Sequence, residues 1–175
     1  VDEYQTNFNS DVVFSLQSEN TIVIDTDSEL SEFLADIGSG AIALTNQSII
    51  IDSAAPITVS QANDIDELTE GTITASIATD STIDSLKTLT GTNAYTIVIP
   101  PDDVHGVHGR LASDLITIKA ATSVSLDGSL IGKVVGSYDE VTDVYDSGVS
   151  YLSSEDITIT DELTVTQANI LDDLT

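Results

Sequence analysis

Two histidines have the spacing of metal ligands. His105 and His108 lie three residues apart, close to Asp102 and Asp103. On a helix this spacing would let both imidazoles reach one transition metal ion. The glycines in this stretch also fit an exposed turn that simply carries two histidines. Both interpretations stay open, and the turn is the simpler one.

No recognisable nucleophile accompanies these histidines. A hydrolytic triad needs a serine or cysteine beside a base, yet the chain has no cysteine and no Gly-x-Ser-x-Gly elbow. No glycine-rich phosphate loop follows any strand-like run either. These patterns predict a protein that is not an enzyme and binds no nucleotide.

Pairs of adjacent carboxylates recur at expected turns and helix ends, and they offer the oxygen ligands that calcium prefers. The pairs are Asp66 with Glu67, Asp102 with Asp103, Asp139 with Glu140, and Asp172 with Asp173. For any single pair, solvated surface charge is the simpler interpretation. We predict weak calcium binding, without a catalytic metal, at Asp66, Glu67, Asp102, Asp103, Asp172 and Asp173.

A very acidic composition limits the partners. The 175 residues include 30 Asp and Glu against four Lys and Arg, a formal net charge of −26. This charge repels nucleic acid and anionic lipid, and no apolar run approaches a membrane span, so we expect neither nucleic acid binding nor membrane insertion. Strong salt would screen the self-repulsion. The 41% hydrophobic residues and mean hydropathy of +0.14 indicate a folded chain.

The charge is unevenly distributed along the chain. Residues 1–86 carry sixteen carboxylates and no Lys or Arg, and residues 134–175 carry ten carboxylates and no base. Residues 87–133 contain all four basic residues and four carboxylates. Chance clustering of so few bases and a contact surface are both possible explanations.

Two passages of the chain are near copies. Ile57–Thr69 reads ITVSQANDIDELT and Glu162–Thr175 reads ELTVTQANILDDLT, and aligning Thr58 with Thr164 keeps most positions identical. Each copy predicts a strand, a capping residue and a short amphipathic helix. Related units are expected near 57–71, 81–91 and 163–175. The first copy continues into the strand-like TITASI, whereas the second stops before that point.

Short β-branched runs alternate with helical patterns along the whole chain. A helix capped by Asp27 or Ser28 is expected to end at Gly38, and a long helix is expected from Ser129 to Asp146. No Asn-Gly hairpin signal occurs, which favours parallel pairing through helical crossovers. Strands are expected at 12–16, 21–25, 41–44, 48–52, 72–78, 95–99, 115–119, 123–126 and 156–160.

These elements predict a β-rich repeat solenoid, in which parallel strands alternate with short amphipathic helices and stack into a sheet along one side. A β-sandwich is the alternative. Residues 1–20 would form an N-terminal arm or edge strand, and residues 21–175 a single domain. We expect Leu68 and Leu174 to be buried at equivalent helix positions, with Ala62 and Ala168 facing the sheet.

Three passages between residues 55 and 175 resemble a class of large proteins. TVSQANDIDELTEGTITASI, LTGTNAYTIVI and VYDSGVSYLSSEDITITDELTVTQAN are similar to repeats of giant acidic secreted or cell-surface proteins of marine bacteria and cyanobacteria, grouped with haemolysin-type calcium-binding proteins. The resemblance implies an extracellular or cell-surface location. The Gly- and Asp-rich calcium-binding nonapeptides of that class do not occur in this sequence, so the resemblance assigns no calcium ligand.

These features favour a non-enzymatic structural module of an extracellular assembly, either a surface-protein repeat or a subunit stacked end to end in a filament or coat. Its partners would be identical subunits or adjacent repeats of the same polypeptide. We expect the C-terminal end to contact a following segment or an identical subunit, with VVFSL at 12–16 a candidate strand. The alternative is a calcium-dependent adhesion or carbohydrate-binding module, although eight Phe and Tyr and no Trp offer little for sugar stacking.

Calcium is expected to stabilise the protein gradually, through several weak carboxylate sites rather than one tight site. Thermal unfolding in chelator and in millimolar calcium should then differ by a shift that grows with calcium concentration. If the unfolding temperature at low salt is the same in chelator and in calcium, cations do not contribute to the stability.

Overall fold

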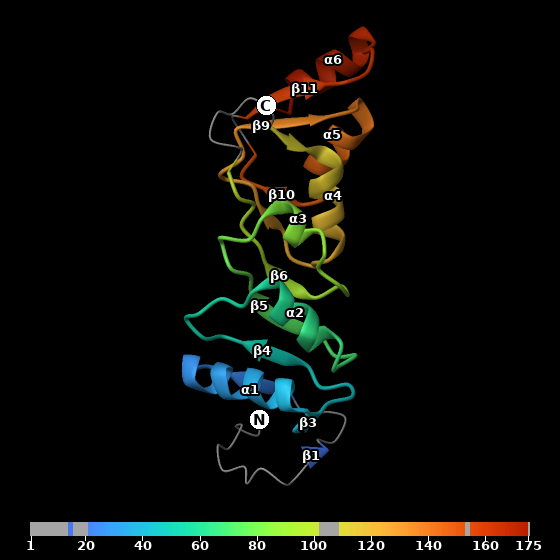
Figure 1. The fold of residues 1–175 in the computed structure, drawn as a ribbon. Coiled ribbons are helices and arrows are strands. Elements are labelled where there is room, and N and C mark those ends of the chain that lie inside the picture. Colours follow the sequence, from blue (N-terminus) through green and yellow to red (C-terminus); the bar gives the residue numbers. More distant parts are fainter. Residues whose placement is uncertain (1–13, 16–20, 102–108, 153–154, 175) are drawn as a thin grey trace.

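The computed structural model describes residues 14–15, 21–101, 109–152 and 155–174. These residues form a mixed α/β fold whose elements follow one another along the long axis of the molecule (Figure 1). The helices are α1 (Asp27–Ser39), α2 (Val59–Asp66), α3 (Ile83–Leu86), α4 (Ala112–Ala120), α5 (Tyr138–Asp146) and α6 (Val165–Asp172). The strands are β1 (Phe14–Ser15), β2 (Ile22–Ile24), β3 (Ile42–Ala43), β4 (Ile49–Ile51), β5 (Ile73–Ser76), β6 (Ala94–Thr96), β7 (Arg110–Leu111), β8 (Leu126–Asp127), β9 (Lys133–Gly136), β10 (Val149–Ser150) and β11 (Asp156–Ile159).

Every strand pair in the described part of the chain is parallel. One sheet has the order β2-β4-β5-β6, another has the order β11-β9-β7, and β1 pairs with β3 and β8 with β10. Parallel neighbours need a crossover. In the four-stranded sheet α1, α2 and α3 each lie in one of the three crossovers. The predicted alternation of parallel strands with helices is therefore present.

Neither predicted architecture is correct. A solenoid would stack its strands into one continuous sheet, whereas the described strands are divided among four separate sheets of two to four strands. In the described residues, isolated bridges rather than a ladder connect the β6 region to the strands that follow, such as Val98 with Asp127. After Ile99, Pro100 and Pro101 have no N–H with which to extend the pairing. The β-sandwich is wrong because its sheets would be antiparallel.

Capping boxes begin the helices of both near copies, as the repeat predicts. Thr58 Oγ1 accepts the N–H of Gln61 at 3.2 Å, and Thr164 Oγ1 accepts the N–H of Gln167 at 3.3 Å. In each case the glutamine side chain accepts the N–H of the threonine in return. The predicted capping residue of each near copy is therefore present. In the third related unit the N-cap of α3 is Thr82, whose side chain accepts the N–H of Ser85, so a capping box of Ser81 with Asp84, which the sequence also predicts, is wrong by one residue.

Two segments differ from the expected element type. The strand expected at 115–119 lies within α4, and the long helix expected from Ser129 to Asp146 is wrong in its first half, which forms β9. α5 begins only after its N-cap, Ser137. The side chains that α4 buries are spaced by three residues, as on one face of a helix: Ala112, Leu115 and Ile118.

The helix after β2 also differs at its ends. α1 begins after Thr26, whose side chain accepts the N–H of Glu29, rather than after Asp27 or Ser28. It runs past Gly38 to Gly40, where a backbone φ of 72° closes the last turn. Glycine adopts this left-handed conformation without steric cost.

The two near copies lie in different environments. Ala62 is fully buried, as predicted, but Ala168 is exposed, so that part of the prediction is wrong. Leu68 and Leu174 are half-buried at matching positions, packed against the core rather than enclosed by it. The expected equivalence of the leucines is present, and their full burial is not.

Only Phe14–Ser15 of the predicted N-terminal arm belongs to the described residues. This segment, β1, pairs with Ile42–Ala43 of the same chain. The rest of the arm, including the other residues of VVFSL, lies outside the described residues.

The different environments predict different responses to one substitution. Ala62→Leu should lower the free energy of unfolding by about 1–3 kcal/mol, because a larger side chain must enter a closed space. Ala168→Leu places the same side chain in solvent and should change it by less than about 0.5 kcal/mol. Urea unfolding followed by circular dichroism measures both. Equal losses in the two variants would contradict the described burial.

Candidate functional site

One predicted calcium ligand, Asp66, belongs to a polar network between α2 and β6. The Nδ2 of Asn93 donates to Asp66 Oδ1 at 2.7 Å, and the Oδ1 of Asn93 accepts the N–H of Ile73 at 2.9 Å. Asn93 is almost completely buried, so its amide requires such partners. Asp66 therefore takes part in a structural bond that connects α2 to the segment leading into β6.

Tyr95 completes this network on the buried side. Its hydroxyl accepts a hydrogen bond from Asn93 Nδ2 at 3.2 Å and donates to the carbonyl of Ala62 at 3.4 Å. Burial raises the pKa of the Tyr95 hydroxyl above its ordinary value, and the negative charge of Asp66 raises it further. The hydroxyl is thus held neutral as a structural donor.

The other predicted carboxylates are not gathered into one site. Glu67, Asp172 and Asp173 are exposed at the C-terminal ends of α2 and α6, which lie at different levels of the molecule (Figure 1). Among the described residues no three Asp, Glu or His side chains are grouped so that they could hold one metal ion. Weak calcium binding at these pairs stays a prediction. Four candidate ligands lie outside the described residues: Asp102, Asp103, His105 and His108.

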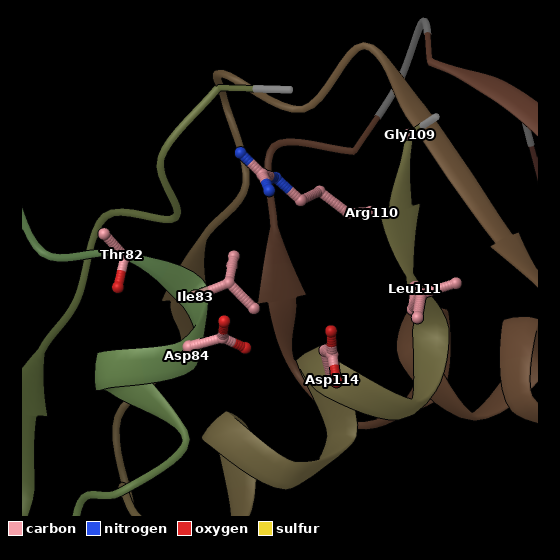
Figure 2. Close-up of a pocket in the computed structure, with 7 residues that line it drawn as sticks. All are labelled: Thr82, Ile83, Asp84, Gly109, Arg110, Leu111 and Asp114. Atoms are coloured by element: carbon pink, nitrogen blue, oxygen red, sulfur yellow. The ribbon is translucent and has the colours of Figure 1, made fainter. Parts of the chain in front are cut away.

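A shallow depression of about 560 Å³ lies between α3 and the beginning of α4. Figure 2 shows Asp84 and Asp114 entering it from these two helices, with Arg110 reaching across from β7. Its lining mixes charged, hydroxyl and aliphatic side chains: Thr82, Ile83, Asp84, Gly109, Arg110, Leu111 and Asp114.

The charged groups around this depression bind one another and the backbone. Lys87 Nζ lies 2.8 Å from Asp114 Oδ1 and 3.4 Å from Asp84 Oδ1, and the hydrogen bond that Lys87 donates to Asp114 raises the pKa of Lys87. Arg110 donates from Nε to the carbonyl of Pro100 at 3.2 Å and from Nη2 to that of Pro101. These contacts connect α3 to α4 and β7 to the end of the preceding segment.

A second polar pair, partly buried, lies between α5 and the residue before β11. The Tyr145 hydroxyl donates to the carboxylate of Glu155, a buried residue just before β11. Burial raises the pKa of Tyr145, and the bond to Glu155 and its charge raise it further. The sequence places Tyr145 on the apolar face of a helix but gives no sign of its partner. The sequence likewise gives no sign of the partners of Asn93. This residue stands in a Thr-Gly-Thr-Asn pattern, which is typical of an exposed turn.

Comparisons with known proteins identify no relative. No family model matches the chain, and neither the curated proteins nor the solved structures provide a match. None of the helices in the described ranges is long and apolar enough to cross a membrane.

The buried tyrosines predict a loss of stability at alkaline pH. The folded protein holds the Tyr95 proton more tightly than the unfolded chain does, so this contribution is complete below the unfolded pKa of about 10 and decreases as the pH rises above it. The free energy of unfolding should fall less steeply above about pH 10 in Tyr95→Phe than in the original chain. Tyr151→Phe, at an exposed position, is the control and should leave the slope unchanged. Identical slopes in all three proteins would contradict the proposed cause.

Proposed function

We propose that the chain is a non-enzymatic structural module of an extracellular assembly, in contact with identical subunits or adjacent repeats of the same polypeptide. One observation carries the proposal, namely the exposed apolar side chains on and just before α6, the helix at one end of the molecule (Figure 1). Leu163 is 38%, Val165 79% and Ile170 42% exposed. Apolar side chains gathered on one exposed element commonly mark a protein contact.

The strand next to this helix supports the same interpretation. β11 pairs with β9 on one side, and no strand of the described chain covers its other edge. An uncovered edge offers a row of N–H and C=O groups to another segment. Helix and strand together therefore offer a surface on which a further unit would extend the molecule along its axis.

The polar groups also support a structural role. Lys87, Arg110 and Asp114 around the depression are engaged in contacts that hold neighbouring segments together, and Asp66 is bonded to Asn93. The net charge of −26 favours a salt-rich surrounding, such as an extracellular one, because mobile ions screen the mutual repulsion of the carboxylates.

Lengthening the chain tests this role. The first near copy ends at Thr69 and is followed by Glu70, so appending residues 70–175 after Thr175 continues the second copy as the first continues. If the module is structural, one and two appended blocks should give rods that lengthen by equal steps in electron micrographs, because each block packs on the one before it. Separate beads joined by irregular connections would contradict the proposal.

A further inference from the structure

The two near copies place matching side chains in opposite surroundings. Val59 is 4% exposed on α2, and its counterpart Val165 is 79% exposed on α6. Likewise Ala62 is buried on α2, whereas its counterpart Ala168 is exposed on α6. Both helices begin with the same capping box, so the difference comes from what lies over them.

The segment that follows α2 supplies its cover. β5 lies parallel to β4, with Ile73 opposite Ile49. Just before α2, Ile57 forms a bridge to Ile77, in which its N–H donates to Ser76 O at 2.9 Å and its carbonyl accepts from Ala78 N at 2.8 Å. This pairing places the following segment beside β4 and the residue that leads into α2.

Polar groups of α2 bind the same segment further along. Asn63 donates from Nδ2 to the carbonyl of Thr88 at 2.8 Å, and its Oδ1 accepts the N–H of Thr90 at 3.0 Å. Asp66 accepts from Asn93. Gly91 has a φ of +71°, and a Cβ at this position would lie 2.4 Å from Asp66 Oδ1. The covering segment therefore needs a Gly-x-Asn turn at this point.

The matching groups of the second copy lack such a cover within the described chain. Asn169 and Asp172, the counterparts of Asn63 and Asp66, are exposed and make no side-chain hydrogen bond to any described residue. Leu163, the counterpart of Ile57, forms no isolated bridge in the described ranges. β4 has a strand on each side, whereas β11 has one described neighbour, β9.

We propose that a polypeptide segment built like residues 71–96 binds the α6 face, defined as Leu163, Val165, Ala168, Asn169 and Asp172 with the open edge of β11. The segment would add a parallel strand to β11, bridge to Leu163, and place a Gly-x-Asn turn on Asn169 and Asp172. This inference rests on the proposed function and specifies the partner that the structural module binds.

Charge favours this occupant over the acidic N-terminal part of a second copy. Residues 71–96 carry two carboxylates and one lysine, a net charge of −1, whereas residues 1–70 carry fourteen carboxylates and no base. Like charges brought together at an interface oppose association. Four carboxylates already lie on or beside the α6 face: Asp161, Glu162, Asp172 and Asp173.

Appending residues 70–100 after Thr175 tests the assignment, because Thr175 aligns with Thr69. The extended chain places the known cover of α2 directly after α6, so amide hydrogen exchange in α6 should become about tenfold slower or more. A chain extended by the same residues in scrambled order is the control, and its α6 amides should exchange as in the original chain.

A matched pair of substitutions adds specificity. In the extended chain Asn169→Ala should reverse much of the added protection, because the appended counterparts of Thr88 and Thr90 lose their partner. In the original chain the same substitution should leave the unfolding midpoint unchanged. Asn63→Ala should lower the midpoint in both chains, since its partners are present in each.

Two results would overturn the assignment. One is unchanged exchange of α6 in the extended chain. The other is self-association of the original chain in sedimentation experiments that Val165→Asp abolishes, because the occupant would then be a second copy. Rods formed by the longer chains, with α6 still exchanging rapidly, would refute this partner and leave the structural function standing. Slow exchange of the α6 amides in the extended chain, with the longer chains seen as separate beads, would support this partner and refute the structural function.

Discussion

Asn93 connects three successive segments of the chain through one buried amide. Its Oδ1 accepts the N–H of Ile73 at 2.9 Å, and its Nδ2 donates to Asp66 at 2.7 Å and to Tyr95 at 3.2 Å. Its own N–H donates to Ala121 O at 3.3 Å. A buried polar group left without a partner costs about 1–3 kcal/mol. The positions of α2, β5 and β6 therefore depend on one another.

Such side-chain bonds matter here because the strands are short. β6 has three residues and can form only a few ladder bonds. Beside it the hydroxyl of Thr122 accepts the N–H of Tyr95 at 3.1 Å and donates to its carbonyl at 2.8 Å, which satisfies backbone groups that no strand reaches. Thr69 similarly donates to the carbonyl of Gln47 at 2.7 Å. Side chains thus connect neighbouring segments where backbone pairing ends.

The sequence predicts the features that form within a few residues and misses those that depend on distant ones. The caps at Thr58 and Thr164 follow from a Thr-x-x-Gln pattern, because a capping box is completed within four residues. The residues of 115–119 have a strand-like composition, but burial against the core selects a helix. The bond between Asp66 and Asn93 spans 27 residues. Nothing in a single sequence distinguishes such an enclosed polar residue from a solvated one, so the carboxylate pairs can be recognised while their surroundings cannot.

The near copies show why an amphipathic pattern alone does not determine burial. α2 and α6 share the same cap, the same three-residue spacing and nearly the same side chains, yet Val59 is enclosed and Val165 faces solvent. Apolar area removed from water contributes roughly 25 cal/mol per Å², and only α2 gains this contribution from its valine. Local propensity and the capping box still form α6, with Leu171 as its buried contact. The helix of the second copy is therefore already shaped for a cover, and a partner that matches it would bind without first having to order the helix.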